Sequence, residues 1–498
     1  IHSFNRTEMK MIIINSDNLE KPLPELHYKK ARAYICGEEN NGVSIVVQAY
    51  GGLEKTRNCV KSILEYTRGE YDLVLMDNGT ADNELIDFFE SVERRKKQII
   101  RITKNITGVY AINNVLRRLN TKYIAVVNND IIVTEGWLDN LLTCAESDDS
   151  IGMICPASTN VSNYQQENLG GFNNSEEMQM KAALFNKSNP AKWEEKIRLI
   201  PTAALYRREV FDTVGLYDAG FMHDFGDDDF TFRVRRAGYK LILCRDTFVH
   251  HDHNQEALPP ERLAISQRSR EFFREKYFGV DAWEDTGNYI NFTFENIDIT
   301  NKNGKSILAV DVKCGTPVLE MKNYCRSYGA DVLYSKVYTS DIKYYADNIS
   351  IASEVICGNP ETLISSENNK FDFIIVGRPL NSYNNPFGFL KNLISKLGGS
   401  GYIIFCVRNA NDARSFLSML NVNIGSQPIE IKAVNYSDFL DKLSEYGCTN
   451  ADIHTTTLPA DKKLKETIAG LVISMNINGD KDSVYQNIMT EDYWITAN

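Results

Sequence analysis

The sequence predicts an α/β fold made of two successive α/β domains. Its 498 residues are too many for one ordinary hydrophobic core. Short β-branched apolar segments alternate with segments of helical periodicity between residues 43 and 133, and a second such series begins near residue 305. The expected organisation is an N-terminal extension (1–42), a first domain (43–280), a linker rich in Asn, Asp and Thr (281–304) and a second domain (305–498).

The composition is that of a globular protein, with 43% hydrophobic and 24% charged residues. The formal net charge is 55 − 66 = −11, which offers no electrostatic basis for nucleic-acid binding. The ten cysteines include no C-x-x-C pair, so we expect reduced, mostly buried thiols of a cytosolic protein. We see no apolar run of membrane-spanning length and no signal-peptide pattern at the start. We therefore expect a cytoplasmic protein that has no membrane span and binds no nucleic acid.

The first domain begins with four predicted strands separated by predicted helices. The strands are expected at residues 43–50, 71–80, 98–104 and 122–133. The first helix carries Cys59, Ile63 and Leu64 on one face, and the next two are expected at 84–97 and 108–119. Such alternation implies a mostly parallel sheet with right-handed crossovers.

Polar residues stand at the ends of three of these strands. They are Gln48 and Tyr50, then Asp77, and then the run 128–130. Ligands of parallel α/β sheets bind beyond the carboxyl ends of the strands. We therefore expect these residues to converge on one crevice.

The rest of the first domain is less regular. Residues 152–206 look like an Asn- and Gln-rich loop region, although 198–211 contains a strand and a turn into a short helix. A helical pattern over 225–239 begins with three aspartates, and a strand over 240–255 ends in three histidines. An amphipathic helix over 266–280 closes the domain.

Two of these polar clusters could carry chemistry. Residues 128–130 offer an amide oxygen and the carboxylate of Asp130, which are ligands for Mg²⁺ or Mn²⁺, although a polar turn would have the same sequence. His250, His251 or His253 could add an imidazole ligand or make a structural hydrogen bond. The aspartates 227–229 could serve as an acidic helix cap. A catalytic carboxylate beside a metal site would instead fit group transfer from a nucleotide-activated donor.

Four stretches taken together resemble the inverting family-two glycosyltransferases, which have the glycosyltransferase-A fold. They are VSIVVQAYGG, LVLMDNGT, NITGVYAINNVLRRLNTKYIAVVNNDIIVTEGWLDNL and REVFDTVGLYDAGFMHDFGDDDFTFRVRRAGYKLILCRDTFVHH. The resemblance runs in one continuous order through residues 43–280. It implies a Rossmann-like domain that uses a nucleotide-diphosphate sugar as donor.

The resemblance also implies roles for single residues in donor binding. It assigns the donor site to Gln48, Tyr50, Asp77, Asn128 and Asn129. Asp77 corresponds to the aspartate that reads a uracil-like base edge. Asp130 corresponds to the last aspartate of the D-x-D motif and would bind a divalent metal, Mn or Mg, with His250 or His251 completing the metal or diphosphate site.

The general base implied by the resemblance is Asp227, the aspartate of an acidic E-D motif in which Gly226 replaces the glutamate. Inversion needs a base that takes the proton of the acceptor hydroxyl. A partly desolvated carboxylate beside other carboxylates has a raised pKa, which suits that task. Asp228 is the second candidate, and Asp229 is expected to be the helix cap.

The second domain resembles a class I methyltransferase that uses S-adenosylmethionine (SAM), through AVDVKCGTPVLEMK at 309–322 and the later strands at 371–405. Asp311 and Gly315 are present, but Lys313 and Pro317 occupy glycine positions, where the backbone must turn tightly near the ligand. The next strand ends at 335–336 without the expected acid. We therefore expect no SAM there, and a scaffold or acceptor-docking module instead.

Three functions are considered. The first is a bacterial-type hexosyl- or N-acetylhexosaminyl-transferase that acts on a hydroxyl of a surface glycan or of a protein; chains that pair these two domains imply flagellin as one such protein. The second is a methyltransferase acting on a glycan, which Lys313 and Pro317 disfavour. The third is a non-catalytic nucleotide-sugar-binding protein. We favour the first because Asp77, Asp130 and Asp227 are all present. The oligomeric state is left open.

Overall fold

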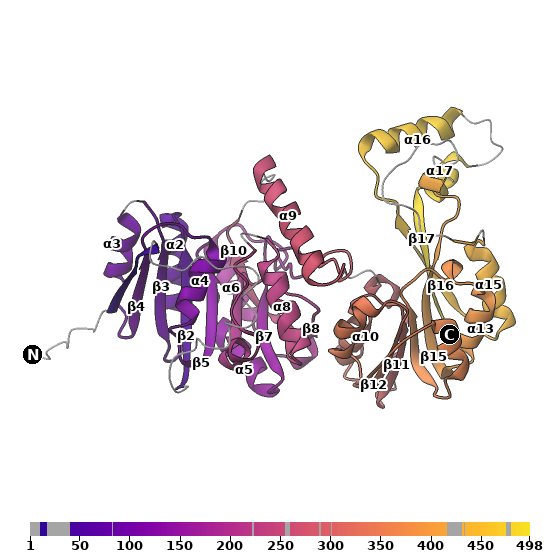
Figure 1. The fold of residues 1–498 in the computed structure, drawn as a ribbon, viewed down its shortest axis with the longest axis horizontal. Helices are drawn as coiled ribbons and strands as arrows, with labels where there is room; N and C mark the ends of the chain where they lie inside the picture. Colours follow the sequence, from indigo (N-terminus) through magenta and orange to yellow (C-terminus); the bar gives the residue numbers. More distant parts are fainter. Residues whose placement is uncertain are drawn as a thin grey trace, which may run out of the picture. The chain divides into compact units, whose positions relative to one another are not determined.

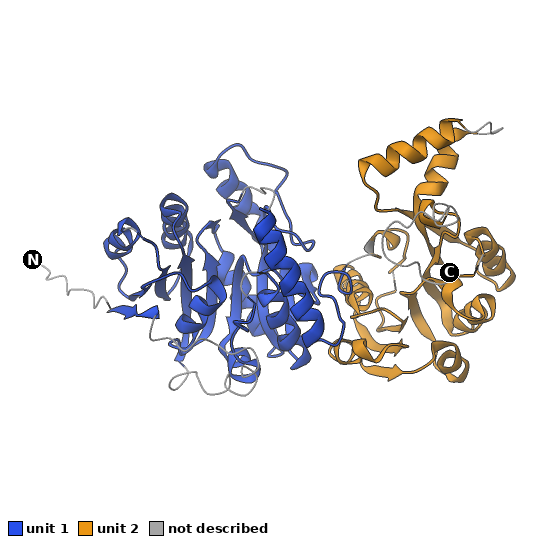
Figure 2. Cartoon of the chain, turned by 45° about the horizontal axis from the view of Figure 1, so that its top comes forward, with its two compact units in different colours: residues 1–287 blue, residues 288–498 orange. Residues whose placement is uncertain are grey.

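The chain divides into two compact units, residues 1–287 and 288–498 (Figure 2). The structure is a computed structural model that describes residues 10–16, 40–81, 83–221, 224–253, 259–287, 290–299, 301–415, 431–432, 434–474 and 480–498. Within the expected extension, residues 10–14 form a strand and residues 40–42 begin the next, while the remainder apart from 15–16 lies outside the described residues.

The first unit contains a ten-stranded mixed sheet among its described residues (Figure 1). Its strands are β1 (Lys10–Ile14), β2 (Asn40–Ala49), β3 (Asp72–Asn78), β4 (Lys97–Ile102), β5 (Thr121–Asn128), β6 (Ile131–Ile132), β7 (Ile151–Ser158), β8 (Trp193–Glu195), β9 (Ala203–Arg207) and β10 (Lys240–His251). The order is β1-β4-β3-β2-β5-β9-β7-β10-β6, with β8 paired to β10. Strands β1 to β5 run parallel, as predicted for β2 to β5.

Helices cover both faces of this sheet (Figure 1). They are α2 (Leu53–Tyr66), α3 (Glu84–Ser91), α4 (Gly108–Leu116), α5 (Trp137–Ser147), α6 (Ser175–Phe185), α7 (Arg208–Val214), α8 (Gly226–Arg236) and α9 (Pro260–Lys276), with the short 3₁₀ turn η4 (Pro190–Lys192). Successive side chains of a strand point to opposite faces. Ile45 and Val47 therefore pack with α2, α3 and α5, whereas Val46 packs with α4, α7 and α8.

One central strand was missed by the sequence prediction. Residues 152–158 were expected in a loop region, but they belong to β7, which is buried along its whole length between β9 and β10. The strand contains Gly152 and Pro156, and both residue types are typical of turns. Gly152 is needed for packing, because a Cβ there would lie 2.8 Å from side-chain atoms of Tyr239 and Val210.

The second unit has a seven-stranded sheet among its described residues, in the order β13-β12-β11-β14-β15-β17-β16. Strands β11 to β15 are parallel, and β17 runs antiparallel to both of its neighbours. The strands are β11 (Lys305–Val310), β12 (Val332–Thr339), β13 (Glu354–Cys357), β14 (Phe371–Val376), β15 (Leu397–Arg408), β16 (Ala451–Thr457) and β17 (Thr490–Ala497).

The helices of the second unit include α12, α13 and α15 on one face of the sheet. Its helices are α10 (Thr316–Ser327), α11 (Tyr345–Ile349), α12 (Pro360–Ser366), α13 (Pro386–Ile394), α15 (Tyr436–Glu445), α16 (Lys462–Ser474) and α17 (Lys481–Met489), with η5 (Asn291–Thr293), η6 (Ile342–Tyr344) and η7 (Leu380–Ser382). The expected linker is packed rather than extended. Asp281 and Ala282 are buried in the first unit, and Phe294 and Ile297 are buried in the second.

Two chain-wide features bear on the sequence predictions. The nine cysteines in the described ranges are free thiols, and all but Cys357 are buried, which confirms the expectation of reduced, buried thiols. Cys36 lies outside the described residues. Among the residues that the structure describes, no helix combines the length and apolar character needed to cross a bilayer.

Candidate active site

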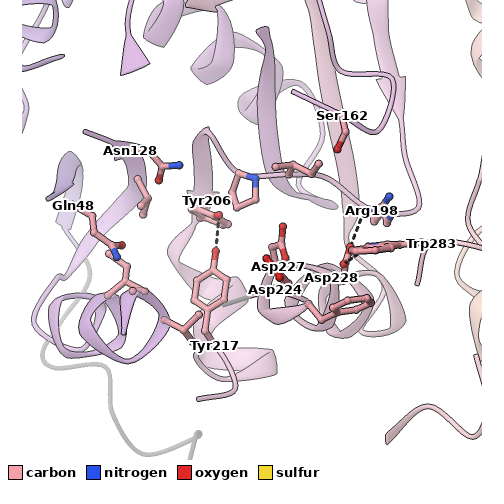
Figure 3. Close-up of a pocket in the computed structure, with 17 residues that line it drawn as sticks. Gln48, Asn128, Ser162, Arg198, Tyr206, Tyr217, Asp224, Asp227, Asp228 and Trp283 are labelled. Atoms are coloured by element: carbon pink, nitrogen blue, oxygen red, sulfur yellow. Dashed lines mark hydrogen bonds and ion pairs between the residues drawn. The ribbon is translucent and has the colours of Figure 1, made fainter. Parts of the chain in front are cut away.

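The polar residues at the strand ends share one edge of the first sheet. Gln48 is in register with Asn128 on one side and with Met76, next to Asp77, on the other. A cleft of about 710 Å³ opens at this edge. In Figure 3, Gln48 and Asn128 lie on one side of the cleft, and Asp227 from the start of α8 lies across from them.

Asp77 joins the loops that follow β2 and β3. Its carboxylate is buried, accepts the backbone N–H of Thr80 at 2.9 Å and lies 3.6 Å from Nε of Arg101. The hydroxyl of Thr80 in turn accepts the backbone N–H of Gly51 at 3.0 Å. Tyr50, just before Gly51, is 59% exposed.

Asn129 ties the loop after β5 to the start of α2. Its side-chain amide donates to the hydroxyl of Thr56 at 2.9 Å and to the carbonyl of Gly51 at 3.4 Å. Asn128 lines the cleft, whereas the side chain of Asn129 is committed to these loop contacts. Of the predicted donor residues, Gln48 and Asn128 thus face the cleft directly.

Helix α8 begins at a sharp backbone turn beside the cleft. Phe225 precedes the helix with φ 69°, in the left-handed region, and its buried ring stacks on Trp283 with a centroid distance of 4.6 Å. A Cβ on Gly226 would lie 3.2 Å from Val109 and 3.5 Å from Phe221. A side chain at this position would require a small shift of Val109.

Asp229 is not the helix cap that the sequence suggested. Phe225 holds the cap position, and no side chain there caps the helix. The buried carboxylate of Asp229 lies 2.9 Å from Nε of Arg233 and 2.5 Å from Nζ of Lys276, and it accepts the hydroxyl of Tyr277 at 2.8 Å. Burial alone would raise its pKa, but these two cations hold the pKa below its ordinary value.

Asp228 is held by two donors from distant parts of the first unit. Its Oδ1 accepts from Nη1 of Arg198 at 2.9 Å, and its Oδ2 accepts from Nε1 of Trp283 at 3.1 Å. Arg198 is itself fixed, since its Nε donates to the hydroxyl of Thr286 at 3.1 Å. Because both oxygens are occupied and the side chain is buried, Asp228 is poorly placed to take a proton from a substrate.

Asp227 lines the cleft and is partly exposed to it. Burial raises its pKa to about 7; the neighbouring charge of Asp228 contributes, and the guanidinium of Arg198 partly opposes the rise. Tyr206 and Tyr217, whose hydroxyls lie 2.7 Å apart, line the cleft beside it (Figure 3). A carboxyl group that ionises near neutral pH and faces a cleft can act as a general base.

A cluster suited to a metal ion lies where β6 pairs with β10. Ile131 is in register with His251, and this pairing brings the preceding Asp130 close to two imidazoles. Ligand atoms of Asp130, His251 and His253 all lie within 4.8 Å of one another. Oδ2 of Asp130 is 3.4 Å from Nε2 of His251 and 3.6 Å from Nδ1 of His253.

The surroundings of His251 also favour metal binding. Its Nδ1 lies 3.2 Å from the carbonyl oxygen of Asn160, so a proton on Nδ1 leaves the lone pair of Nε2 directed towards Asp130. Burial would raise the pKa of Asp130, but the hydrogen bond and charge of His251 keep it below its ordinary value. One carboxylate and two imidazoles can serve as ligands of a divalent cation.

His250 lies outside this cluster, although the sequence had placed it among the metal residues. Adjacent residues of a strand point to opposite faces, and Nδ1 of His250 lies 2.7 Å from the hydroxyl of Thr159. Its ring packs edge-on against Phe172. The exposed His253, which had been mentioned only as an alternative, completes the cluster instead.

Sequence reasoning also missed Arg198 and Trp283. Arg198 begins the stretch 198–211, which was expected to contain a strand, and Trp283 lies in the stretch expected to be a linker. A buried carboxylate requires hydrogen-bonding partners, so Asp228 could have indicated that an arginine was needed. Nothing in the local sequence indicates which arginine would provide it.

In the second unit, side chains of α11 contact the loop after β11. Nδ2 of Asn348, from α11, donates to the carbonyl of Lys313 at 3.0 Å, and Sγ of Cys314 lies 3.7 Å from Oδ2 of Asp347. A Cβ on Gly315 would lie 2.1 Å from Ile351. Lys313 keeps a left-handed φ of 52° that a glycine would adopt without strain. These residues do not fit SAM at the loop after β11.

Comparison with known proteins bears on the first unit. Residues 44–215 match the family model "Glycosyl transferase family 2". The chain is 24% identical over 213 residues to glycosyltransferase GlyG of Streptococcus pneumoniae serotype 4, which covers 41% of this chain and 68% of that protein. It is 22% identical over 249 residues to the uncharacterized protein y4gI of Sinorhizobium fredii, which covers 47% of this chain but only 27% of that protein.

Among solved structures, GalNAc-T7 with UDP, GalNAc and Mn²⁺ is similar with a TM-score of 0.38 and 15% identity. That match covers 49% of this chain and 50% of the other. The match to the family model is the comparison that bears on the class of protein. The matched residues lie within the first unit and extend from β2 to the end of α7, and α8 with its aspartates begins beyond them at Gly226.

Proposed function

We propose that the first unit is an inverting glycosyltransferase. It moves a sugar from a nucleotide-diphosphate donor to a hydroxyl group of a glycan or protein acceptor. One observation carries the proposal: a single cleft contains Gln48 and Asn128 at one side and the carboxyl of Asp227 at the other. The family-two domain supports the reaction class.

The proposed chemistry is a single displacement at the anomeric carbon. Asp227 takes the proton of the acceptor hydroxyl while its oxygen attacks from the face opposite the diphosphate, and the bond from carbon to diphosphate oxygen breaks. Asp228 does not transfer the proton. Fixed by Arg198 and Trp283, it orients the first turn of α8 and keeps the pKa of Asp227 high.

Donor binding is proposed for the opposite side of the cleft. Gln48 and Asn128 would contact the donor directly, whereas Tyr50 and Asp77 would contact its base at the neighbouring strand ends. Asp130, His251 and His253 would hold a divalent cation, Mn or Mg. Such a cation neutralises the charge that develops on a leaving diphosphate.

For the second unit we propose a scaffold or acceptor-docking role. Its parallel strands with crossover helices are compatible with a methyltransferase-like ancestry. The side chains of α11 that contact the loop after β11 argue against SAM chemistry there. No observation favours the methyltransferase function over glycosyl transfer.

A calorimetric screen of UDP, GDP, dTDP and their sugars, with and without Mn²⁺, tests the proposal on the full chain. We expect one nucleotide class to bind, with tighter binding in the presence of Mn²⁺. Mass spectrometry of reactions with hydroxyl acceptors should then detect transfer by the wild type. If no nucleotide diphosphate or nucleotide sugar binds under either condition, the proposed function is wrong.

A further inference from the structure

A separate polar cavity lies in the second unit, where β15 ends at Arg408. Its volume is about 370 Å³, within the range of small-molecule sites. The walls come from three places that are distant in sequence. They are the turn after β15 (409–411), the start of α15 (435–437), and α17 with the beginning of β17, including Asn487 and Tyr493.

Several polar side-chain groups on these walls, including those of the exposed Asn411 and Ser437, have no protein partner among the described residues. Within the described part of the chain, no protein group hydrogen-bonds to the side-chain amide of Asn411 or to the hydroxyls of Tyr436 and Ser437. Amides and hydroxyls can each donate and accept hydrogen bonds. A ligand with alternating donors and acceptors, such as a polyol, would satisfy them.

One wall of the cavity is flat, apolar and rigid. The rings of Tyr436 and Tyr493 stack with centroids 4.1 Å apart and an interplanar angle of 22°. The hydroxyl of Tyr493 donates to Oδ1 of Asn487 at 3.1 Å, which fixes the pair. The outer face of such a stacked pair offers contact area to the C–H face of a sugar ring.

The charges at the cavity argue against an anionic ligand. Arg408, the charged residue of the lining, donates to Asp492 at 2.6 Å and to Glu491 at 3.0 Å. Arg414 likewise pairs with Glu491 at 2.7 Å and with Asp412 at 3.1 Å. Two cations therefore face three carboxylates, so the network has no excess positive charge for a phosphate or carboxylate.

We propose that this cavity is a binding subsite for a neutral sugar. The evidence is the combination of uncommitted amide and hydroxyl groups, the stacked tyrosine wall and the neutralised arginine around one cavity. Sugar binding at this place does not require transfer in the first unit. The further step, that the sugar belongs to the acceptor glycan, rests on the proposed function.

The test uses the full chain without donor and with EDTA. Saturation-transfer NMR would measure binding of glucose, galactose, mannose, N-acetylglucosamine and N-acetylgalactosamine, with inorganic phosphate and adenosine as probes of other chemistry. We expect at least one neutral sugar to bind. Its affinity should fall about tenfold in the double variant Asn411→Ala/Ser437→Ala, which removes two hydrogen-bonding groups.

A matched control separates this effect from a general loss of structure. Asn384 and Ser444 are exposed residues outside the cavity, and Ser444 lies on the same helix as Ser437. Asn384→Ala/Ser444→Ala should bind sugar like the wild type.

Three outcomes would overturn the proposal. They are failure of every neutral sugar to bind, sugar binding that is unchanged in Asn411→Ala/Ser437→Ala, and binding of phosphate or adenosine that is tighter than any sugar and is lost in that variant. None of these outcomes bears on nucleotide-sugar binding by the first unit.

Discussion

The carboxylate of Asp228 and the guanidinium of Arg198 form a 2.9 Å ion pair at the wall of the cleft. With Trp283 on the second oxygen, the pair fixes Asp228 in one position. Within the described ranges, no side chain hydrogen-bonds to Asp227, the residue just before it. Three consecutive aspartates therefore differ in their surroundings: one faces the cleft, one is clamped, and one is buried among cations.

The change Asp227→Asn should abolish transfer without abolishing donor binding. The amide cannot accept the acceptor proton, so we expect kcat to fall by about 10²- to 10⁴-fold. Calorimetry with the nucleotide sugar should give a Kd close to that of the wild type. Loss of donor binding would instead move the base to another residue.

The pH dependence of transfer should respond to Asp228. The base must be ionised, so the rate should fall as the pH drops below about 7, where burial and the charge of Asp228 place the pKa of Asp227. Asp228→Asn removes the like charge and leaves Arg198 to act on Asp227, and both effects lower that pKa. The acidic limb of the kcat profile should therefore move to lower pH. An unmoved limb would show that Asp227 is not the titrating base.

Asp227 should also make stability depend on pH. Its folded-state pKa is raised, so the folded state holds more protons than the unfolded state between about pH 4 and pH 7. Stability should then fall as the pH rises through this window. Asp227→Asn removes this contribution, so its Tm relative to the wild type should increase from pH 5 to pH 8. A constant difference across this range would contradict the raised pKa.

Asp229→Asn should affect folding rather than chemistry. It leaves the buried Arg233 without its carboxylate partner and Lys276 with Asp218 alone, which we expect to cost about 3–5 kcal/mol of unfolding free energy. Denaturant unfolding measures this loss. The fraction of the variant that remains folded should keep its KM for the donor, in contrast to a residue that contacts substrate.

Replacement of three neighbouring histidines should affect Mn²⁺ affinity to different extents. His251→Ala and His253→Ala each remove a ligand atom, so Mn²⁺ affinity should fall at least tenfold. His250→Ala removes a contact to Thr159 and should leave Mn²⁺ affinity within twofold. Electron paramagnetic resonance of free Mn²⁺ measures all three variants. Equal losses in the three variants would contradict the assignment.

Strands β2 to β5 of the first sheet could be predicted from sequence because each contains a run of apolar residues. The same runs placed Gln48, Asp77 and Asn128 at one edge, because in-register parallel strands end together. Strand β7 could not be predicted in this way, since Gly152 and Pro156 interrupt its pattern, and the glycine is needed for packing.

The candidate site was predictable only where its residues are local in sequence. The acidic run that starts α8 indicated three aspartates, and the family resemblance singled out Asp227 among them. The clamp on Asp228 depends on Arg198 and Trp283, thirty residues before it and fifty-five after it, and no periodicity connects them. The choice between His250 and His251 depended on the pairing of β10 with the two-residue strand β6, which is too short to recognise.

The position of Trp283 sets the minimum length of a working catalytic fragment. The sequence predicts that the first domain ends at residue 280. A chain cut there would lose both Trp283 and the Thr286 hydroxyl that fixes Arg198. Without Trp283, one face of the Phe225 ring would be exposed, and Phe225 is the residue that precedes α8. A fragment for expression or domain exchange should therefore extend at least to Gly287, because the last few residues of the unit complete the wall of its active site.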